Sequence, residues 1–240
     1  MRQVKFLLMV AAIVAGAWAP AAAQTATGEW DVVVAPYFMG ASMGGNTTVR
    51  GREVEVDVPA SEIFSNLQFG AMGLVLAKKG HWGFGADAIW MALGTTVRDT
   101  NVDFNQGAFA FYGLRELGPA ADLTFGLRVN TLQGELRFKT IGLDVSQDKN
   151  WVDPIVGLRL HTPGNRRVSL GVYGEIGGFG AGSDFEWQLF PRVGFRLTET
   201  ASLEFGWRWL DMDYATGEGT EQFGYDVLTQ GPVAGFAFRI

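Results

Sequence analysis

The chain has 240 residues, of which 48% are hydrophobic, 13% aromatic and only 18% charged, and 33 are glycine. With 25 acidic against 19 basic residues its formal net charge is −6, which argues against nucleic-acid binding because that requires a positive surface. It has no cysteine, so a small disulfide-bonded secreted scaffold is excluded.

The first 23 residues have the features of a secretory signal peptide. Arg2 and Lys5 supply early positive charges, and an apolar run and a small-residue stretch ending at Ala23 follow. The run is shorter than the about 20 apolar residues that a permanent membrane helix needs. We therefore expect residues 1–23 to direct export and to be removed, and residues 24–240 to form one β-barrel domain.

Apolar residues then recur at every second position over most of the chain. In "NWVDPIVGLRLHT" the even positions, such as Val152 and Val156, are apolar, whereas the odd positions, such as Asp153 and Arg159, are polar or small. The segments "RVSLGVYGEIG", "DFEWQLFPRVGFRL" and "SLEFGWRW" repeat the pattern. This alternation predicts β-strands that each have one apolar and one polar face.

The alternating segments number about ten and indicate an all-β fold. Short and long connections alternate between them, which is typical of a single up-and-down antiparallel transmembrane β-barrel. We expect about ten strands, with eight or twelve as the alternatives. A short helix is expected only at "PASEIFSNL", where Ser61 can cap it. The expected strands are residues 28–48, 67–78, 81–97, 105–117, 121–136, 149–161, 166–178, 184–197, 201–213 and 226–240.

The lengths of the connections predict the orientation of the barrel. Short periplasmic turns and long outer loops are the rule in bacterial outer-membrane barrels. We therefore expect both termini on the periplasmic side and the connections 49–66, 137–148 and 214–225 on the outer side.

The same alternation would also fit a soluble periplasmic lipid-binding barrel, which is one alternative. A soluble barrel has a charged outer face, whereas here the polar face consists of glycines with single charged residues, as a confined interior requires. Tryptophans lie near expected strand ends, with Trp30 and Trp82 at short turns and Trp151 and Trp187 at long loops. Such positions match the aromatic girdles of a membrane barrel, which we favour.

The chain ends on "GPVAGFAFRI", in which Phe236, Phe238 and Ile240 form an apolar stripe. In hydrocarbon this stripe needs no cover, and the last strand is expected to close the sheet against the first. The ending resembles the C-terminal assembly signal of outer-membrane barrels, with Gly235, Phe238 and Ile240 at the matching positions. Ile240 replaces the usual Phe, and Val233 stands at a usually polar position. The resemblance implies recognition by the barrel-assembly machinery.

Three internal segments, "WVDPIVGLRL", "GGFGAGSDFEWQ" and "GWRWLDMDY", resemble a group of proteobacterial outer-membrane proteins described as porin-like. The resemblance extends over most of the chain after the signal peptide. It implies a small porin-like barrel in the Gram-negative outer membrane, surrounded by lipid and lipopolysaccharide. It implies no catalytic residue.

Charged residues on the polar faces are expected to meet inside the barrel, which is only slightly wider than the eight-strand barrel that side chains just fill. Asp153 and Glu175 are expected to be neighbours on adjacent strands. A buried charge is tolerated only when it is paired or hydrated, so the network is either a plug of ion pairs or a narrow water-filled path for small solutes. The expected lumen network consists of Asp87, Arg128, Asp153, Glu175, Arg192, Arg196, Glu204 and Arg208.

Alternation across the last-but-one hairpin predicts particular neighbours. If residues 198–201 form the turn, Arg196 lies beside Glu204. The same reflection places Arg192 beside Arg208, and these two cations would repel each other unless acids reach them.

Catalytic constellations are scarce. Both histidines, His81 and His161, lie beside short turns, away from the outer end at which outer-membrane enzymes mostly act. Asp211 and Asp213 in "LDMDY" lie near the outer rim, where paired carboxylates could activate water or bind a divalent cation between lipopolysaccharide phosphates. The glycines of "GGFGAG" predict a tight turn, because a strand follows instead of the helix that a phosphate loop requires.

We therefore expect a non-enzymatic outer-membrane barrel, acting as a structural or surface protein or as a narrow porin-like channel, with no cofactor or metal. There are two alternatives: the soluble periplasmic barrel, and an outer-membrane enzyme that uses the carboxylates of Asp211 and Asp213.

Overall fold

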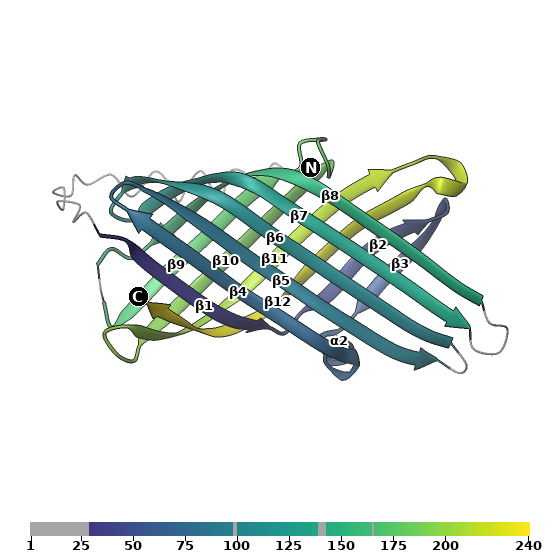
Figure 1. The fold of residues 1–240 in the computed structure, drawn as a ribbon, viewed down its shortest axis with the longest axis horizontal. Coiled ribbons are helices and arrows are strands. Elements are labelled where there is room, and N and C mark those ends of the chain that lie inside the picture. Colours follow the sequence, from purple (N-terminus) through teal and green to yellow (C-terminus); the bar gives the residue numbers. More distant parts are fainter. Residues whose placement is uncertain (1–28, 98–99, 139–142, 165) are drawn as a thin grey trace.

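A computed structural model describes residues 29–97, 100–138, 143–164 and 166–240 of the chain. Its strands form one sheet that closes on itself as an antiparallel barrel of ten strands (Figure 1). This confirms the all-β, up-and-down barrel expected from the alternation. The expected signal peptide, residues 1–23, lies outside the described residues.

Each barrel strand pairs with the next barrel strand along the chain, and the last pairs with the first. The connection between the first two barrel strands contains extra elements. That connection contains β2 (Ser42–Val49), β3 (Arg52–Val58) and α2 (Ala60–Asn66). A 3-10 turn, η1 (Gly219–Glu221), precedes the last strand. The ten barrel strands are β1 (Asp31–Met39), β4 (Leu67–Lys79), β5 (Trp82–Val97), β6 (Thr100–Gly118), β7 (Ala121–Phe138), β8 (Leu143–His161), β9 (Val168–Gly177), β10 (Phe185–Arg196), β11 (Ala201–Thr216) and β12 (Phe223–Arg239).

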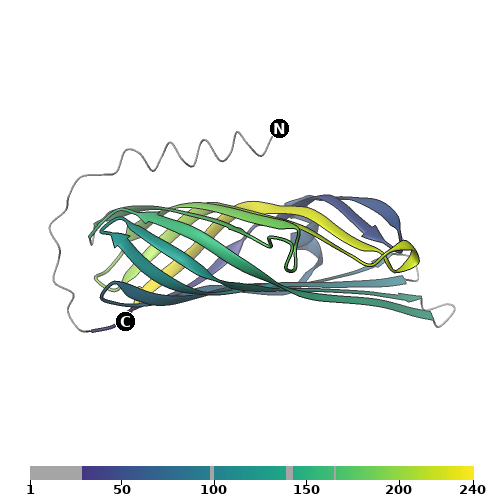
Figure 2. The ribbon, with the colours of Figure 1, turned by 90° about the horizontal axis from the view of Figure 1, so that it is seen from above.

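The two ends of the barrel differ. At one end, which we call the short-turn end, lie the tight connections β4–β5 and β6–β7 together with the start of β1 and the end of β12 (Figure 2). At the opposite end, which we call the long end, the strands β5 to β8 extend furthest (Figure 1). Both ends of the described chain therefore lie at the same end of the barrel.

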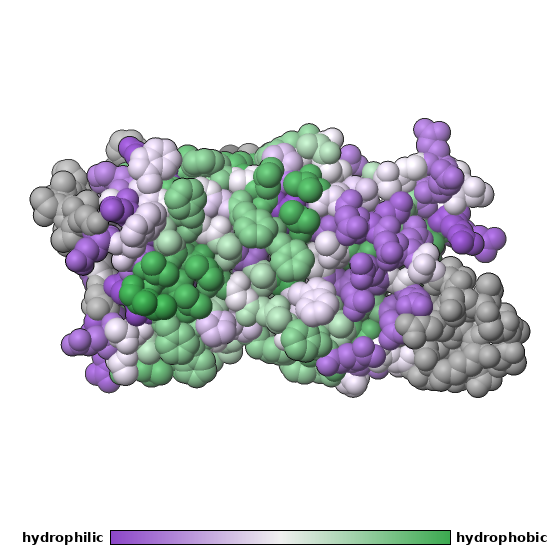
Figure 3. Space-filling view, in the orientation of Figure 1, coloured by the Kyte–Doolittle hydropathy of each residue, from purple (hydrophilic) through white to green (hydrophobic). Residues whose placement is uncertain are grey.

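Side chains alternate between the lumen and the outer surface, as the sequence predicts. In β8, Asp153 is fully buried, whereas its neighbour Val152 is 46% exposed. Apolar side chains form a broad band across the visible face, and hydrophilic side chains lie at both of its ends (Figure 3). Soluble proteins rarely expose contiguous apolar area of this extent. The band therefore fits hydrocarbon surroundings and does not fit a soluble barrel.

The last strand closes the barrel against the first, as expected. In the register of β12 with β1, Phe238 lies opposite Val34, and Gly235 also pairs with β1. Phe236, Phe238 and Ile240 point outward and are 47%, 43% and 80% exposed. The apolar C-terminal stripe is thus part of the outer band.

The first expected strand, residues 28–48, is in fact two strands. β1 ends at Met39, and β2 begins at Ser42 and pairs with the half of β12 nearest the long end. The expected helix is present as α2, but Ser61 does not cap it, because Pro59 occupies the N-cap position without a side-chain hydrogen bond.

Most of the expected long loops are strands. β7 continues to Phe138 and β8 begins at Leu143, so the expected connection 137–148 is mostly strand, and residues 139–142 lie outside the described part of the chain. The expected loop 214–225 is likewise shortened, because β11 reaches Thr216. Hydrogen-bonded pairing between strands does not need the alternation that marks a membrane strand, so the strands continue after that alternation has ended.

The expected tryptophan girdle is only partly correct. Trp30 and Trp82 are 50% and 54% exposed at the short-turn end, as a girdle requires. Trp151, in contrast, is 6% exposed and stacks on Tyr214 with ring centroids 4.2 Å apart. Its odd position in β8 places it on the same face as Asp153, so it fills the lumen instead of the membrane interface.

Candidate functional site

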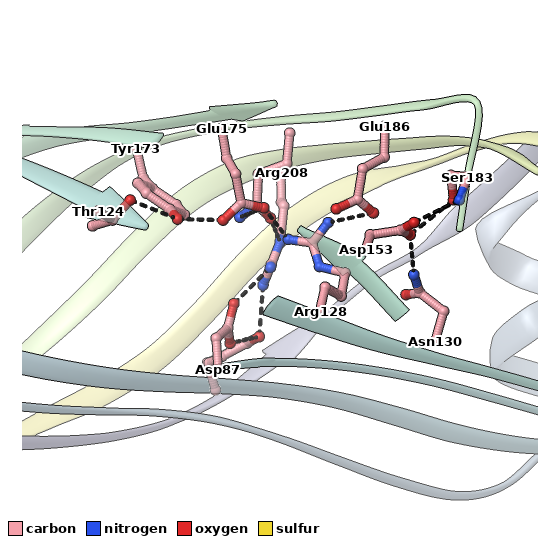
Figure 4. A network of polar contacts seen from close by, with 12 residues as sticks. Asp87, Thr124, Arg128, Asn130, Asp153, Tyr173, Glu175, Ser183, Glu186 and Arg208 are labelled. Atoms are coloured by element: carbon pink, nitrogen blue, oxygen red, sulfur yellow. Dashed lines mark hydrogen bonds and ion pairs between the residues drawn. The ribbon is translucent and has the colours of Figure 1, made fainter. Parts of the chain in front are cut away.

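A fully buried arginine lies near the middle of the lumen. Arg128 on β7 is 1% exposed and donates from Nη1 to Glu186 Oε2 at 3.2 Å and from Nη2 to Glu175 Oε1 (Figure 4). Both carboxylates are themselves at most 1% exposed and come from β10 and β9. We call these three residues the Arg128 cluster. One cation is thus shared by two acids, and Glu186 Oε1 is left without a partner among the described residues.

A second arginine lies beside the first and connects four strands. Arg208 on β11 donates from Nη2 to Asp87 Oδ2 at 2.6 Å, from Nη1 to the Tyr37 hydroxyl at 2.7 Å and from Nε to Gln188 Oε1 at 2.8 Å. The Tyr37 hydroxyl donates in turn to Asp87 Oδ1 at 2.7 Å. We call these four residues the Arg208 cluster. Each of the three guanidinium nitrogens of Arg208 donates to one of the other three residues.

The two clusters form one network. Gln188 Nε2 donates to Glu175 Oε1 at 3.5 Å, and the Tyr173 hydroxyl donates to the other oxygen of Glu175. Arg128 and Arg208 lie close together in the lumen, with the acids Asp87, Glu175 and Glu186 around them (Figure 4). We refer to the two clusters together as the central network. Its short charge-assisted hydrogen bonds are the strong kind in a protein interior.

Asp153 is held separately by four donors. Its carboxylate accepts from Asn130 Nδ2 at 2.7 Å, from Trp151 Nε1 at 2.9 Å and from Ser183 Oγ at 2.8 Å, and also from the Ser183 amide. Asp153 is fully buried, so these bonds replace the water that the charge has lost. They also fasten the β9–β10 connection to the barrel wall.

Three predicted pairings of lumen residues differ from the registers of the strands. Arg196 lies opposite Ser202, and Glu204 lies opposite Gly194, because the Leu197 amide bonds to Ala201 O and shifts the register of the hairpin by two residues. The predicted register, with Arg196 opposite Glu204, is therefore wrong.

The registers also separate the other two predicted pairs. Arg192 lies opposite Gly206 instead of beside Arg208, and its Nη1 lies 4.0 Å from Glu204 Oε2. Asp153 is not beside Glu175, because the register of β8 with β9 pairs Glu175 with Gly157. Arg192, Arg196 and Glu204 accordingly lie nearer the short-turn end than the central network.

Three members of the central network were not predicted from the sequence. Glu186 and Gln188 stand on the polar face of "DFEWQL", so the alternation does place them in the lumen, but nothing in the sequence indicates their partners. Tyr37 is the polar member of a mostly apolar inner stripe in β1. Its hydrogen bonds to Asp87 of β5 and Arg208 of β11 depend on the closed barrel, which the sequence pattern does not describe.

An apolar core fills the lumen between the central network and the long end. It includes Met91, Leu132, Leu210 and Val227, each at most 5% exposed. On the opposite side of the network lies a cavity of about 560 Å³ that opens at the short-turn end, which we call the vestibule. A smaller cavity of about 50 Å³, lined by Tyr37, Asp87 and other residues, lies between the vestibule and the network. The lumen is therefore open on one side and packed on the other.

Neither histidine forms a catalytic arrangement with the outer carboxylates. His81 Nδ1 lies 3.5 Å from Glu116, and His161 Nε2 lies 3.3 Å from Asp122, both at the short-turn end. Asp211 and Asp213 lie on the face of β11 opposite to the buried Met212, so they point away from the lumen. Among the described residues no group of three or more His, Asp or Glu is placed to hold a metal ion.

The predicted turn at "GGFGAG" is confirmed. Gly178 and Gly180 have φ of 82° and 75°, and the Gly180 amide bonds to Ser183 O at 3.0 Å. A glycine adopts such angles without steric cost. The turn delivers Ser183 to Asp153 and has no helix after it.

The closed ten-stranded barrel, its apolar outer band and its filled lumen define the fold of an outer-membrane β-barrel protein. No helix in the described ranges is long and apolar enough to cross a membrane. No protein-family model and no curated protein sequence matches the chain.

Solved structures of similar shape are Gram-negative outer-membrane barrels. The outer-membrane protease OmpT from Escherichia coli aligns over 91% of this chain and 99% of its own, with a TM-score of 0.52 and 11% identity. Ail, the attachment invasion locus protein of Yersinia pestis, aligns over 89% of this chain and 100% of its own, with a TM-score of 0.41 and 9% identity. Neisserial surface protein A aligns over 90% and 100%, with a TM-score of 0.33 and 11% identity. At such identities the likeness shows the fold alone.

Proposed function

We propose that the protein is a non-enzymatic integral barrel of the Gram-negative outer membrane whose lumen is closed, and that it acts as a structural or surface protein. The observation that carries the proposal is the central network. Two buried arginines and their acceptors occupy the middle of the lumen, and the apolar core beyond them excludes water. A ten-stranded barrel is close to the size that side chains fill completely.

The length of the strands supports a role at the surface. β6 and β8 each have 19 residues, whereas a membrane strand needs about 9–11. The surplus lies toward the long end, where the visible surface is hydrophilic (Figure 3). A paired sheet of this kind is stiffer than loops would be. The barrel thereby holds a defined surface outside the lipid.

The proposal extends to membrane lipid, lipopolysaccharide and the barrel-assembly machinery as partners. The exposed Phe84 and Phe111, at 66% and 57%, would contact lipid chains. Asp211 and Asp213 lie near the edge of the band, where a divalent cation bound by lipopolysaccharide phosphates could reach them. An enzyme that combines these two carboxylates with a histidine is disfavoured because both histidines lie at the other end of the barrel.

The test of the closed lumen is electrical. The wild-type barrel, reconstituted in planar bilayers in concentrated KCl, should give no steady conductance steps above the baseline. An open porin reconstituted in parallel serves as the positive control for insertion. Large stable steps from the wild-type protein would contradict the plug and would favour the alternative of a narrow water-filled channel for small solutes.

The orientation can be tested by labelling, because the chain has no cysteine of its own. We expect Thr220→Cys, at the long end, to react with a membrane-impermeant maleimide in intact cells. Arg166→Cys, at the short-turn end, should react only after the outer membrane is permeabilised. Both native side chains are exposed, so access to the reagent depends on the side of the membrane. The opposite labelling pattern would invert the proposed topology.

A further inference from the structure

The vestibule has a positive lining in an acidic protein. Its described lining contains six Lys or Arg residues against four Asp or Glu residues, whereas the whole chain carries a net charge of −6. The cationic members are Lys78, Arg159, Arg166, Arg192, Arg196 and Arg239, and the acidic members are Asp31, Asp122, Glu199 and Glu204. A confined cavity with an excess of one sign of charge attracts ions of the other sign.

The acids at the wall of the vestibule are already engaged with other cations. Asp31 pairs with Arg239 at 3.0 Å, and Asp122 pairs with Lys78 at 2.8 Å and with His161 at 3.3 Å. Asp122 also lies opposite Arg159 in the register of β7 with β8, so its single negative charge is shared among several basic groups.

Two arginines lie where the vestibule narrows. Arg159 on β8 and Arg192 on β10 line both the vestibule and the small cavity beyond it. In the intervening strand β9, Gly171 lies opposite Arg192 and Tyr173 lies opposite Arg159, and a Cβ at Gly171 would lie 2.9 Å from Arg192 Nε. The Arg192 side chain therefore lies over Gly171, and the positive charge of Arg159 acts on it.

These two cations lack strong internal partners. Within the described residues, Arg159 makes no hydrogen bond or ion pair. The nearest carboxylate oxygen recorded for Arg192 is Glu204 Oε2 at 4.0 Å, and Glu204 also accepts from Ser202 Oγ at 2.8 Å. Arg128 and Arg208, in contrast, each donate directly to at least one carboxylate. A bound anion would supply acceptor oxygens to these two guanidinium groups.

We propose that Arg159 and Arg192 form a binding site for a small soluble oxyanion, bearing a carboxylate or phosphate group, that enters through the vestibule. Guanidinium groups match carboxylate and phosphate oxygens with paired hydrogen bonds. The cavity volume of about 560 Å³ lies in the range of small-molecule sites. The site lies inside the lumen and away from the lipid-facing band, so a dissolved compound fits it better than a lipid headgroup does. The site itself does not depend on the proposed topology. The topology decides only from which side of the membrane the compound enters.

The test is calorimetric titration of the folded full barrel in detergent with inorganic phosphate, pyrophosphate and citrate. We expect at least one of these anions to bind, and Arg159→Gln and Arg192→Gln each to weaken that binding about tenfold or more. Arg115→Gln is the control. It removes a cation at the same end of the barrel that stacks on Trp82 outside the lumen, and it should leave the affinity for the anion unchanged. Heat-modifiable migration in gels verifies that each variant is folded.

A variant that keeps both charges separates geometry from net charge. Gly171→Ala should displace Arg192 and weaken binding while the net charge stays the same. No binding of any of the three anions, or equal affinities in the wild type and both Gln variants, would overturn the site. Loss of anion binding in nanodiscs that contain phosphatidylglycerol, but not in neutral nanodiscs, would assign the site to a lipid headgroup and overturn its assignment to a soluble compound.

Discussion

Arg128→Ala should lower the free energy of unfolding by about 3–5 kcal/mol, the cost of breaking a buried ion pair from one side. Arg128 is 1% exposed, and its removal leaves the carboxylates of Glu175 and Glu186 facing each other without their shared cation. Urea-induced unfolding of the refolded barrel, followed by tryptophan fluorescence, measures the change. Arg52→Ala, at an exposed position of β3, is the control and should change the free energy by no more than about 0.5 kcal/mol.

The size of this effect also reports whether water reaches the network. If the lumen were hydrated, the two carboxylates would regain solvent, and Arg128→Ala would cost less than about 1 kcal/mol. That result would contradict the closed lumen independently of any conductance record. Replacing all three members together, as Arg128→Met with Glu175→Gln and Glu186→Gln, should recover most of the lost stability, because no uncompensated charge would then remain buried.

The sequence predicts the face of each strand much better than its partners. The outward position of Val152 and the inward position of Asp153 follow from alternation alone, since hydrocarbon outside and a confined lumen inside impose opposite chemistries on neighbouring residues. The pairing of Arg196 with Glu204 was wrong because it depended on which residues form one turn. A turn that starts one residue earlier shifts every pair in the hairpin by two.

The central network shows a second limit. Arg128 and Glu186 are separated by 58 positions, and Arg208 and Asp87 by 121. Such contacts across a barrel depend on the number of strands, their tilt and their stagger together, and none of these is contained in a local pattern. The long end shows a third limit, because strands that leave the membrane lose the apolar stripe by which they were recognised.

The largest effect is expected at the C-terminus, because its last residues complete the ring. The Arg239 amide bonds to Thr200 O and the Ile240 amide bonds to Val32 O, each at 2.8 Å, so the end of the chain joins β11 on one side and β1 on the other. Arg239 Nε also lies 3.0 Å from Asp31. Without these contacts, the edges of β1 and β11 at the short-turn end would expose unpaired amides to lipid, where each costs several kcal/mol.

Deleting residues 238–240 should therefore abolish assembled barrel in the membrane fraction, and the purified chain should also fail to refold into detergent micelles. A second variant, Phe238→Ala with Ile240→Ala, separates ring closure from the proposed assembly signal, because it keeps the backbone hydrogen bonds but removes the outward apolar groups, which are 43% and 80% exposed. It should refold in micelles but give a low membrane yield in cells. Phe111→Ala removes an aromatic group of the same band from the middle of β6 and should assemble normally. Normal membrane yield of the deletion would show that neither closure at this end nor the terminal stripe is needed, whereas normal yield of the double alanine variant alone would leave strand closure as the sole role of the C-terminus.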